Sequence, residues 1–196
     1  DRWMTREGFC LTRWADDFVI VCRTRKEAQR ALATAEQFLH EGLGVMLHPQ
    51  KTRIVHVSQG FAFLGYKVKQ GTGHRLAASK RRGRSNPLNL YAIPREKSVT
   101  RFREQIRKLT RRKAPLTMRE MIDQINPVIR GWGTFYRKAD VRRLFHRLDG
   151  WIVRRLYASL AKRWRNTLWR RYPTSRLIAE LGLVRLTHLI PGLVQR

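Results

Sequence analysis

The hydrophobic pattern of the chain changes once, at a basic segment near residue 80. Before this segment, short apolar runs are separated by turns and enclose one helical pattern, which predicts strands around a helix. Between residues 70 and 87 the composition shifts to Gly, Ser, Lys and Arg, as in a loop or linker. After Pro94 the apolar spacing is helical throughout. This order predicts an α+β fold, with a layer of strands and one helix followed by a small helical bundle.

Positive charge dominates the composition and is concentrated in the second part of the chain. The 42 Lys and Arg residues outnumber the 14 Asp and Glu residues, which gives a formal net charge of +28. Residues 1–74 hold 11 basic and 7 acidic residues, whereas residues 75–196 hold 31 and 7. Such a field destabilises a compact chain unless an anion binds, and a polyphosphate is the usual anion. Nucleic acid is therefore the expected partner, and ribosomal-type structural binding also fits the charge.

Size and cysteine content limit the class of protein. The 196 residues are 42% hydrophobic, enough to bury a core in one large or two small domains. The two cysteines, Cys10 and Cys22, form neither a disulfide framework nor a metal-binding spacing, so we expect a reducing, cytoplasmic location. No run of about 18 apolar residues is present, so no membrane partner is expected. Because the chain opens on Asp1 close to an apolar segment, we expect that its start is not the natural one.

The first part is predicted to contain a hairpin, a helix and further strands. Residues 9–12 and 18–22 are β-rich and enclose Asp16 and Asp17, which predicts a tight hairpin with both aspartates at its tip. Thr24 and Glu27 have the spacing of a capping box, and a helix should follow as far as Gly42. Further strands are predicted at 43–47, 54–57 and 61–68.

The second part is predicted to be helical, with breaks at Pro and Gly. One basic helix with its apolar stripe from Val99 to Leu109 should close at Ala114-Pro115, and a capping box at Thr117 and Glu120 should start the next. Pro127 is expected to kink this helix, and Gly131-Trp132-Gly133 is expected to end it. A long amphipathic segment from Val141 to Trp164 should follow.

Adjacent carboxylates are the first candidate for chemistry. Like charges a few ångströms apart repel, and a divalent cation removes that repulsion. Hard carboxylate oxygens suit Mg²⁺, which serves phosphoryl transfer in pairs, so Asp16 and Asp17 could be metal ligands. Because side chains alternate along a strand, only one of them should face the metals squarely. A solvated turn is the alternative for this pair.

Three motifs in the first part resemble reverse transcriptases. Trp14-Ala15-Asp16-Asp17 is similar to the aromatic-Ala-Asp-Asp hairpin of the palm active site, with Trp in place of the usual Tyr. Residues 43–52, which end in Lys51-Thr52, look like the next motif of the family, and Gly60-Phe61-Ala62-Phe63-Leu64-Gly65-Tyr66 resembles its primer grip. The three motifs occur in the order of the family, which makes them far more specific together than singly.

Two further motifs narrow the resemblance to one family. Residues 125–136, with the core Gly131-Trp132-Gly133, and residues 145–152, with Asp149 and Trp151, resemble the thumb or maturase X domain of group II intron-encoded proteins. The resemblance implies the C-terminal part of a reverse-transcriptase palm over residues 1–93 and an all-α thumb over 94–172, with a tail over 173–196. The alternative is that Trp132, Tyr136, Trp151 and Trp164 are helix core, and this alternative is preferred for Trp151 and Trp164.

The resemblance also implies roles for residues of the first part. Asp16, with Asp17 second, would bind two Mg²⁺ ions of an RNA-directed DNA polymerase. Lys51 would lie near the incoming triphosphate, or it is a solvated turn lysine. Phe63, Leu64, Gly65 and Tyr66 would hold the primer end, with Gly65 allowing close backbone approach.

Phosphate contacts are expected along the basic segments, because their density of Arg suits bidentate binding. Arg142, Arg143, Arg154 and Arg155 are expected to line a second helical face, although one or two of them should instead support helix ends or ion pairs. The residues expected to bind nucleic acid are Lys80, Arg81, Arg82 and Arg84 in the loop, Arg101, Arg107, Lys108, Arg111, Arg112 and Lys113 on the basic helix, and Arg142 and Arg143 beyond it.

The family places a further metal-binding aspartate and the template-binding fingers before the hairpin, and the chain lacks this sequence. We therefore expect the chain to be inactive in polymerisation unless an N-terminal segment or companion chain completes the site. The expected partners are group II intron RNA and a DNA target or primer. The alternatives are an RNA-binding maturase module without polymerase activity, and a reverse transcriptase of a defence or CRISPR-linked system.

Overall fold

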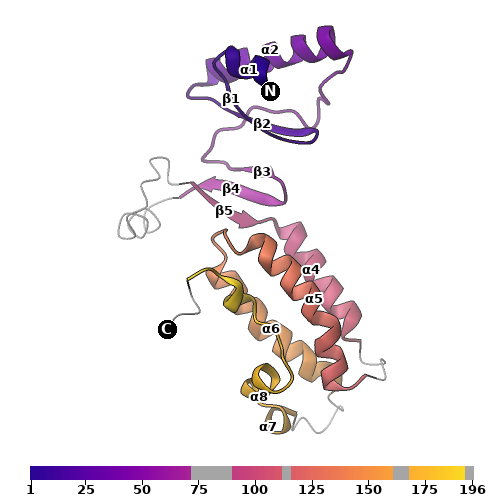
Figure 1. Ribbon diagram of the computed structural model, residues 1–196. Coiled ribbons are helices and arrows are strands. Elements are labelled where there is room, and N and C mark those ends of the chain that lie inside the picture. The colour runs from indigo at the N-terminus through magenta and orange to yellow at the C-terminus, as the bar shows by residue number, and fades with distance from the viewer. Residues whose placement is uncertain (72–89, 112–115, 161–167, 193–196) are drawn as a thin grey trace. The chain divides into compact units, whose positions relative to one another are not determined.

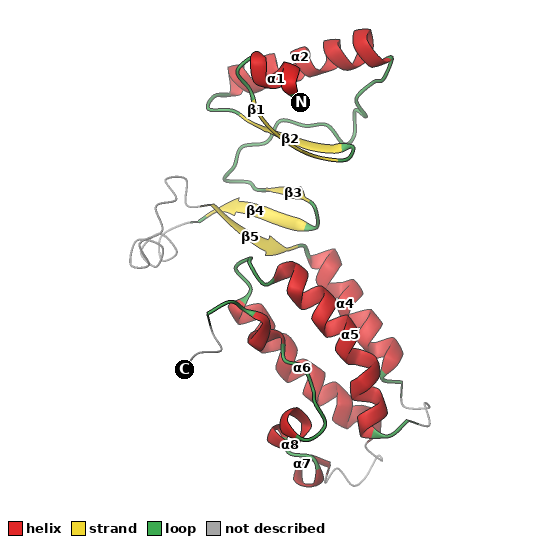
Figure 2. Cartoon of the chain, viewed as in Figure 1, coloured by secondary structure: helices red, strands yellow, loops and turns green. Residues whose placement is uncertain are grey.

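The computed structural model describes residues 1–71, 90–111, 116–160 and 168–192. The chain divides into two compact units, Asp1–Leu90 and Tyr91–Arg196. The first unit holds helices and antiparallel strands and the second is mainly helical, so the fold is α+β, as predicted (Figure 1 and Figure 2). The domain ranges given above stay predictions.

The first unit contains the tight hairpin that the sequence predicts, but only one of the two aspartates, Asp16, lies in its loop. Strands β1 (Cys10–Trp14) and β2 (Asp17–Val21) pair antiparallel, with Trp14 opposite Asp17. The two-residue loop between them is therefore Ala15-Asp16, and Ala15 has a φ of 53°. A positive φ at the first loop residue matches the strand twist that two-residue hairpins need. Asp16 thus lies at the tip, while Asp17 is already the first residue of a strand.

A long helix packs against this hairpin. Helix α2 (Arg25–Leu43) starts at Thr24, whose hydroxyl accepts a hydrogen bond from the Glu27 amide. The Glu27 carboxylate accepts one from the Arg23 amide at 2.7 Å. The helix ends at Gly44 in the left-handed conformation, two residues after the predicted end. With helix α1 (Arg2–Arg6), it buries a small apolar core whose members are Met4, Phe9, Ala31 and Ala35.

The strands predicted at 43–47 and 54–57 are wrong. Leu43 ends helix α2, and the described residues 44–60 contain no strand. Apolar side chains here are open to solvent, with Met46 80% and Val45 52% exposed. A β-rich run forms a strand only when another strand pairs with it, and none of the described residues does so here.

A second hairpin follows, where the sequence predicts one strand region. Strand β3 (Phe61–Phe63) pairs antiparallel with β4 (Tyr66–Gln70), and the loop is Leu64-Gly65. Both loop residues have positive φ, 47° and 80°, as a type I′ turn requires. Gly60 precedes the hairpin, and a Cβ there would lie 2.7 Å from the Val68 carbonyl oxygen.

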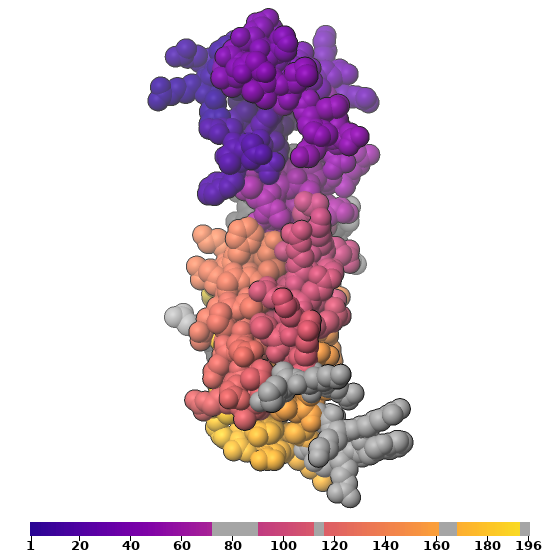
Figure 3. Space-filling view, turned by 90° about the vertical axis from the view of Figure 1, so that its right-hand side faces the viewer, coloured from indigo at the N-terminus to yellow at the C-terminus, as the bar shows by residue number. Residues whose placement is uncertain are grey.

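Three helices form the body of the second unit. Strand β5 (Leu90–Pro94) leads into α4 (Glu96–Leu109), which is followed by α5 (Met118–Tyr136) and α6 (Arg142–Leu160). Helix α5 begins with the predicted capping box, in which the Thr117 hydroxyl and the Glu120 carboxylate each accept an amide hydrogen bond from the other residue. Figure 3 shows α4 and α5 side by side on one face of this unit. In the described part of the chain, no helix has the length and apolarity that crossing a membrane requires.

The helix break predicted at Gly131-Trp132-Gly133 is wrong. Helix α5 continues through Pro127 and both glycines to Tyr136. Gly133 serves tertiary packing instead, because a Cβ there would lie 2.5 Å from Leu189 Cδ1 and 2.8 Å from Leu186 Cδ2. The missing side chain lets the last segment of the chain approach the helix closely.

This last segment completes the core of the second unit. It contains α7 (Leu168–Arg171), α8 (Thr174–Ala179) and the 3₁₀ helix η1 (Leu186–Leu189). Leu177, Leu183 and Leu186 are buried with the side chains of α4, α5 and α6. Residues beyond 173 are therefore part of the helical core as far as the structure describes them.

Two buried polar side chains hold the last segment in place. Asn126 on α5 donates to the Gly182 carbonyl oxygen at 3.0 Å and accepts from the Val184 amide at 2.9 Å. Asp149 on α6 accepts from the amides of Leu186 and Thr187 and from the Thr187 hydroxyl. We call Asn126 and Asp149 the polar clasp.

Candidate functional site

The hairpin presents both aspartates to solvent. Asp16 and Asp17 are exposed, and neither side-chain carboxylate makes a hydrogen bond or ion pair with a described residue. Arg13 braces the loop, because its guanidinium donates to the Ala15 carbonyl oxygen and to both carboxylate oxygens of Asp1, at 2.7 to 3.0 Å. This bracing role of Arg13 is missed by the sequence analysis, since its carboxylate partner lies twelve residues away.

The chemistry of the two aspartates fits a magnesium ion in part. Their carboxylate oxygens are hard ligands, and the absence of described partners leaves all four oxygens available. Among the residues that the structure describes, no group of three or more His, Cys, Asp or Glu could hold a metal. Cys22 follows the far end of β2, away from the loop that holds Asp16, and burial and the Glu27 carboxylate both raise the pKa of its thiol.

Lys51 lies in a turn of the first unit. The amides of Lys51 and Thr52 both donate to the His48 carbonyl oxygen, at 3.0 and 2.9 Å. The Lys51 side chain is exposed and forms no ion pair with a described residue. The structure therefore does not join Lys51 to either aspartate by a direct contact.

The residues predicted to form the primer grip lie on the second hairpin. Phe63 and Tyr66 are opposite each other in the register and half-buried, and Leu64 and Gly65 make the turn between them. The positive φ of Leu64 is unfavourable for a side chain of this kind. The turn thus places a strained residue at an exposed point.

Six of the basic residues predicted to bind nucleic acid lie in the described part of the second unit and are exposed. No ion pair joins the six described candidates to an acidic residue in the described ranges. These exposed candidates are Arg101, Arg107, Lys108, Arg111, Arg142 and Arg143. The other predicted residues, Lys80, Arg81, Arg82, Arg84, Arg112 and Lys113, lie outside the described residues.

Arg155, Arg103 and one of the six candidates, Arg107, make contacts within the second unit. Arg155 donates to the Thr110 hydroxyl at 3.0 Å and to the Thr110 carbonyl oxygen at 2.9 Å, and so closes the end of α4. Arg103 and Arg107 lie 5.7 and 5.6 Å from the ring centroid of Trp151. These are cation–π distances, so the half-buried Trp151 links α4 to α6.

Trp132 is a packing residue at the centre of the helices. Its ring stacks on Phe102 at 4.5 Å and lies 4.8 Å from the ring of Tyr136. Its indole nitrogen donates to the Ser98 hydroxyl at 3.2 Å. In the Gly-Trp-Gly motif, Trp132 thus packs against α4, and Gly133 lets η1 approach α5 closely.

Two protein families match the chain. Residues 1–68 match the family described as reverse transcriptase (RNA-dependent DNA polymerase), and residues 99–177 match the group II intron, maturase-specific domain. Together, the matches define the class of protein: a reverse-transcriptase segment with a maturase domain. In both parts, the chain is therefore similar to group II intron-encoded reverse transcriptases and maturases.

Curated relatives agree with these matches. Protein YkfC of Escherichia coli is 32% identical over 100 residues, which are 50% of this chain and 24% of that protein. The group II intron-encoded protein LtrA of Lactococcus lactis is 34% identical over 102 residues, 50% of this chain and 17% of LtrA. The putative COX1/OXI3 intron 2 protein of Saccharomyces cerevisiae is 37% identical over 60 residues, 30% of this chain and 7% of that protein. The matched part thus spans a quarter or less of each relative.

Proposed function

We propose that the chain is part of a group II intron reverse transcriptase/maturase that binds intron RNA to promote splicing and supplies Asp16 and Asp17 to an RNA-directed DNA polymerase site. The observation that carries this proposal is the exposed carboxylate pair at the end of the first hairpin. It occurs in a chain whose second unit presents basic side chains without described acidic partners.

RNA binding is assigned to the second unit, within the match to the maturase domain. Exposed guanidinium groups bind phosphates in a bidentate manner, and ammonium groups add charge. Because these contacts read the backbone, the unit would recognise structured RNA mainly by shape. Intron RNA is the partner that the maturase family implies, and a DNA target or primer belongs to the polymerase half of the proposal.

Polymerisation is assigned to the first unit together with a further carboxylate from outside this chain. Asp16 at the tip would be the ligand shared by two Mg²⁺ ions, with Asp17 second. Bound Mg²⁺ would supply Lewis-acid activation of a hydroxyl and charge neutralisation at the phosphates. Lys51 would neutralise the leaving pyrophosphate, and residues 63–66 would position the primer end. An intracellular, cytoplasmic location is part of the same proposal.

One pair of assays tests both halves. Splicing of a precursor RNA that carries a group II intron is measured with the wild-type chain and with Asp16→Asn. Magnesium-dependent primer extension is measured with the same proteins after an N-terminal reverse-transcriptase segment has been added. Asp16→Asn should abolish extension and leave RNA binding unchanged, whereas Asp123→Asn, an exposed aspartate on α5, should change neither.

The alternative of an RNA-binding maturase module gives a different result. A maturase module without polymerase activity would stimulate splicing and would show no extension with either protein. Robust extension by the unsupplemented chain would refute the assignment of a further ligand outside it. Failure to bind any intron RNA would refute the maturase half.

A further inference from the structure

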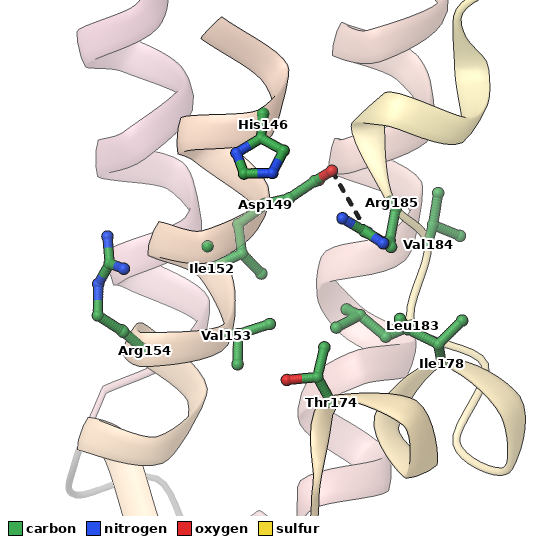
Figure 4. Close-up of a pocket in the computed structure, with 11 residues that line it drawn as sticks. His146, Asp149, Ile152, Val153, Arg154, Thr174, Ile178, Leu183, Val184 and Arg185 are labelled. Atoms are coloured by element: carbon green, nitrogen blue, oxygen red, sulfur yellow. Dashed lines mark ion pairs between the residues drawn. The ribbon is translucent and has the colours of Figure 1, made fainter. Parts of the chain in front are cut away.

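A cavity of about 280 Å³ lies in the second unit, between helix α6, helix α8 and residues 183–185. Figure 4 shows side chains of these three elements converging on it. Of the described residues expected to contact nucleic acid, Arg154 alone lines it. All the residues that line the cavity belong to the second unit.

The wall of the cavity is largely apolar. It is formed by side chains from the three elements: Ile152, Val153, Ile178, Leu183 and Val184. Ile152 is buried, and the other branched side chains are buried or half-buried. Such a wall gains free energy when it covers an apolar or aromatic group.

The lining of the cavity contains two arginines and one carboxylate, so one positive charge has no acidic partner in the lining. Asp149 is the one carboxylate in the lining, and the polar clasp already uses both of its oxygens. Arg185 pairs with it, with 3.6 Å between Nε and Oδ2 (Figure 4). Arg154 is exposed and forms no ion pair with a described residue. In the view of Figure 4, Arg154 and Arg185 lie on opposite sides of Ile152 and Val153.

The cavity is preformed by contacts that do not depend on a ligand. Residues 182–187 are held by the polar clasp, which joins them to both α5 and α6. The Tyr157 hydroxyl donates to the Tyr172 carbonyl oxygen at 2.7 Å, just before α8. A ligand therefore has little ordering cost to overcome.

We propose that this cavity receives one unpaired nucleobase of an RNA, with Arg154 contacting the adjoining phosphate. The inference rests on the proposed RNA-binding function and names a site for it. An apolar wall beside an unpaired cation suits a flat base that carries a phosphate, whereas a free phosphate would gain nothing from the wall. At about 280 Å³ the cavity is smaller than most ligand pockets, so it holds one ring system rather than a longer segment.

The experiment measures the preference of the full chain for a bulged nucleotide. The probes are RNA hairpins that carry one bulged A, C, G or U, the same hairpin with an abasic bulge, and the fully paired hairpin. Equilibrium binding is measured at fixed salt, and we expect roughly tenfold tighter binding of at least one bulged base than of the abasic bulge. A 2-aminopurine bulge reports burial of the base through its fluorescence.

Matched variants separate the cavity from general electrostatics. Val153→Phe fills the cavity and should reduce the preference to about one, while Val128→Phe, a half-buried valine on α5 outside the lining, should keep it. Arg154→Gln should lower the preference, whereas Arg147→Gln on the same helix should weaken binding of all probes equally. Thermal unfolding establishes that each variant is folded.

The outcomes distinguish this inference from the proposed function. If the wild-type chain binds the paired and bulged hairpins equally, RNA binding stands and the cavity site is refuted. The same follows if Val153→Phe folds and retains the preference, or if Arg154→Gln and Arg147→Gln behave alike. If no RNA binds at all, both the proposed function and the inference fail.

Discussion

Asp149 on α6 is only 6% exposed. Its oxygens accept hydrogen bonds from two amides and one hydroxyl of residues 186 and 187, at 2.7 to 3.2 Å. Buried donors that lose an acceptor carry their full desolvation cost. The identity of this one residue therefore determines how the last segment of the chain attaches.

Replacing Asp149 with Asn tests this role. The amide group of Asn would face donors, so we expect the free energy of unfolding to fall by roughly 2–3 kcal/mol. Urea denaturation measures the loss, and hydrogen exchange should speed up at the amides of Leu186 and Thr187. Asp123→Asn, at an exposed position, should stay within about 0.5 kcal/mol of the wild type. Equal stabilities of the two variants would contradict the role.

At the scale of elements, helix α5 shows two glycines with opposite functions. Gly131 has nothing within 4 Å of a built Cβ, while a Cβ at Gly133 would meet Leu186, which is fully buried. Both positions are helical, so the intrinsic preference of a helix for Ala over Gly is the same at each. Only the packing of η1 distinguishes them.

Alanine at these two positions should change stability in opposite directions. Gly131→Ala should stabilise the chain by about 0.5–1 kcal/mol through helix propensity. Gly133→Ala should destabilise it by about 1–2 kcal/mol, because Leu186 and Leu189 must shift to admit the methyl group. Chemical denaturation of the two variants measures both effects. A stabilised Gly133→Ala chain would show that η1 does not pack as described.

The capping box of α5 makes the stability of this helix depend on pH. Hydrogen bonds from the amide and hydroxyl of Thr117 lower the pKa of the Glu120 carboxyl below its ordinary value of 4.5. Since the folded-state pKa is the lower one, the stabilisation is present above about pH 4.5 and is lost as the pH falls through the folded-state pKa.

Glu120→Gln should therefore lower the melting temperature at pH 7, and this difference from the wild type should shrink as the solution becomes acidic. Thermal unfolding monitored between pH 7 and pH 3 measures the trend. Glu104→Gln, at an exposed position on α4, serves as the matched control. A difference that grows at acidic pH would contradict the sign.

Elements that depend on residues close together in the sequence were predicted correctly, and elements that depend on distant residues were not. The paired residues of the first hairpin lie at most eleven positions apart and those of the capping boxes three apart, so their sequence patterns are sufficient. The strands predicted at 43–47 and 54–57 depend on a partner strand, which a local pattern does not contain. The predicted break at Gly131-Trp132-Gly133 was wrong because contacts with residues more than fifty positions later decide it.

For the candidate sites, the same distinction holds. The aspartates and arginines could be selected as candidates from sequence motifs and charge composition. Their roles stay predictions. The polar clasp could not be predicted, since Asn126 bonds to residues 56 and 58 positions away. The cavity could not be predicted either, because three separate elements build it.

For the whole molecule, the distribution of charge is the dominant property. The formal net charge of +28 lies mostly in residues 75–196. Binding of a polyanion to such a surface releases counterions, so affinity for RNA should fall steeply as salt increases. This holds for any folded RNA and is independent of the cavity.

The salt dependence can be assigned to single residues. Arg101→Gln and Lys108→Gln should each reduce the slope of log affinity against log salt concentration by about one. Fluorescence anisotropy with a structured intron RNA between 50 and 300 mM KCl measures the slope. Lys26→Gln, an exposed residue on α2 of the first unit, should leave it nearly unchanged. Slopes that do not differ among the three variants would place the phosphate contacts elsewhere.

The polar clasp has a consequence for how the second unit can be shortened. A polypeptide that stopped before Gly182 would keep α4, α5 and α6 complete. It would nevertheless leave the Asn126 amide and the Asp149 carboxylate without their hydrogen-bond partners. It would also remove the leucine side chains that pack against Gly133. The three long helices therefore do not form a complete folding unit alone, and a stable fragment must extend through Leu189.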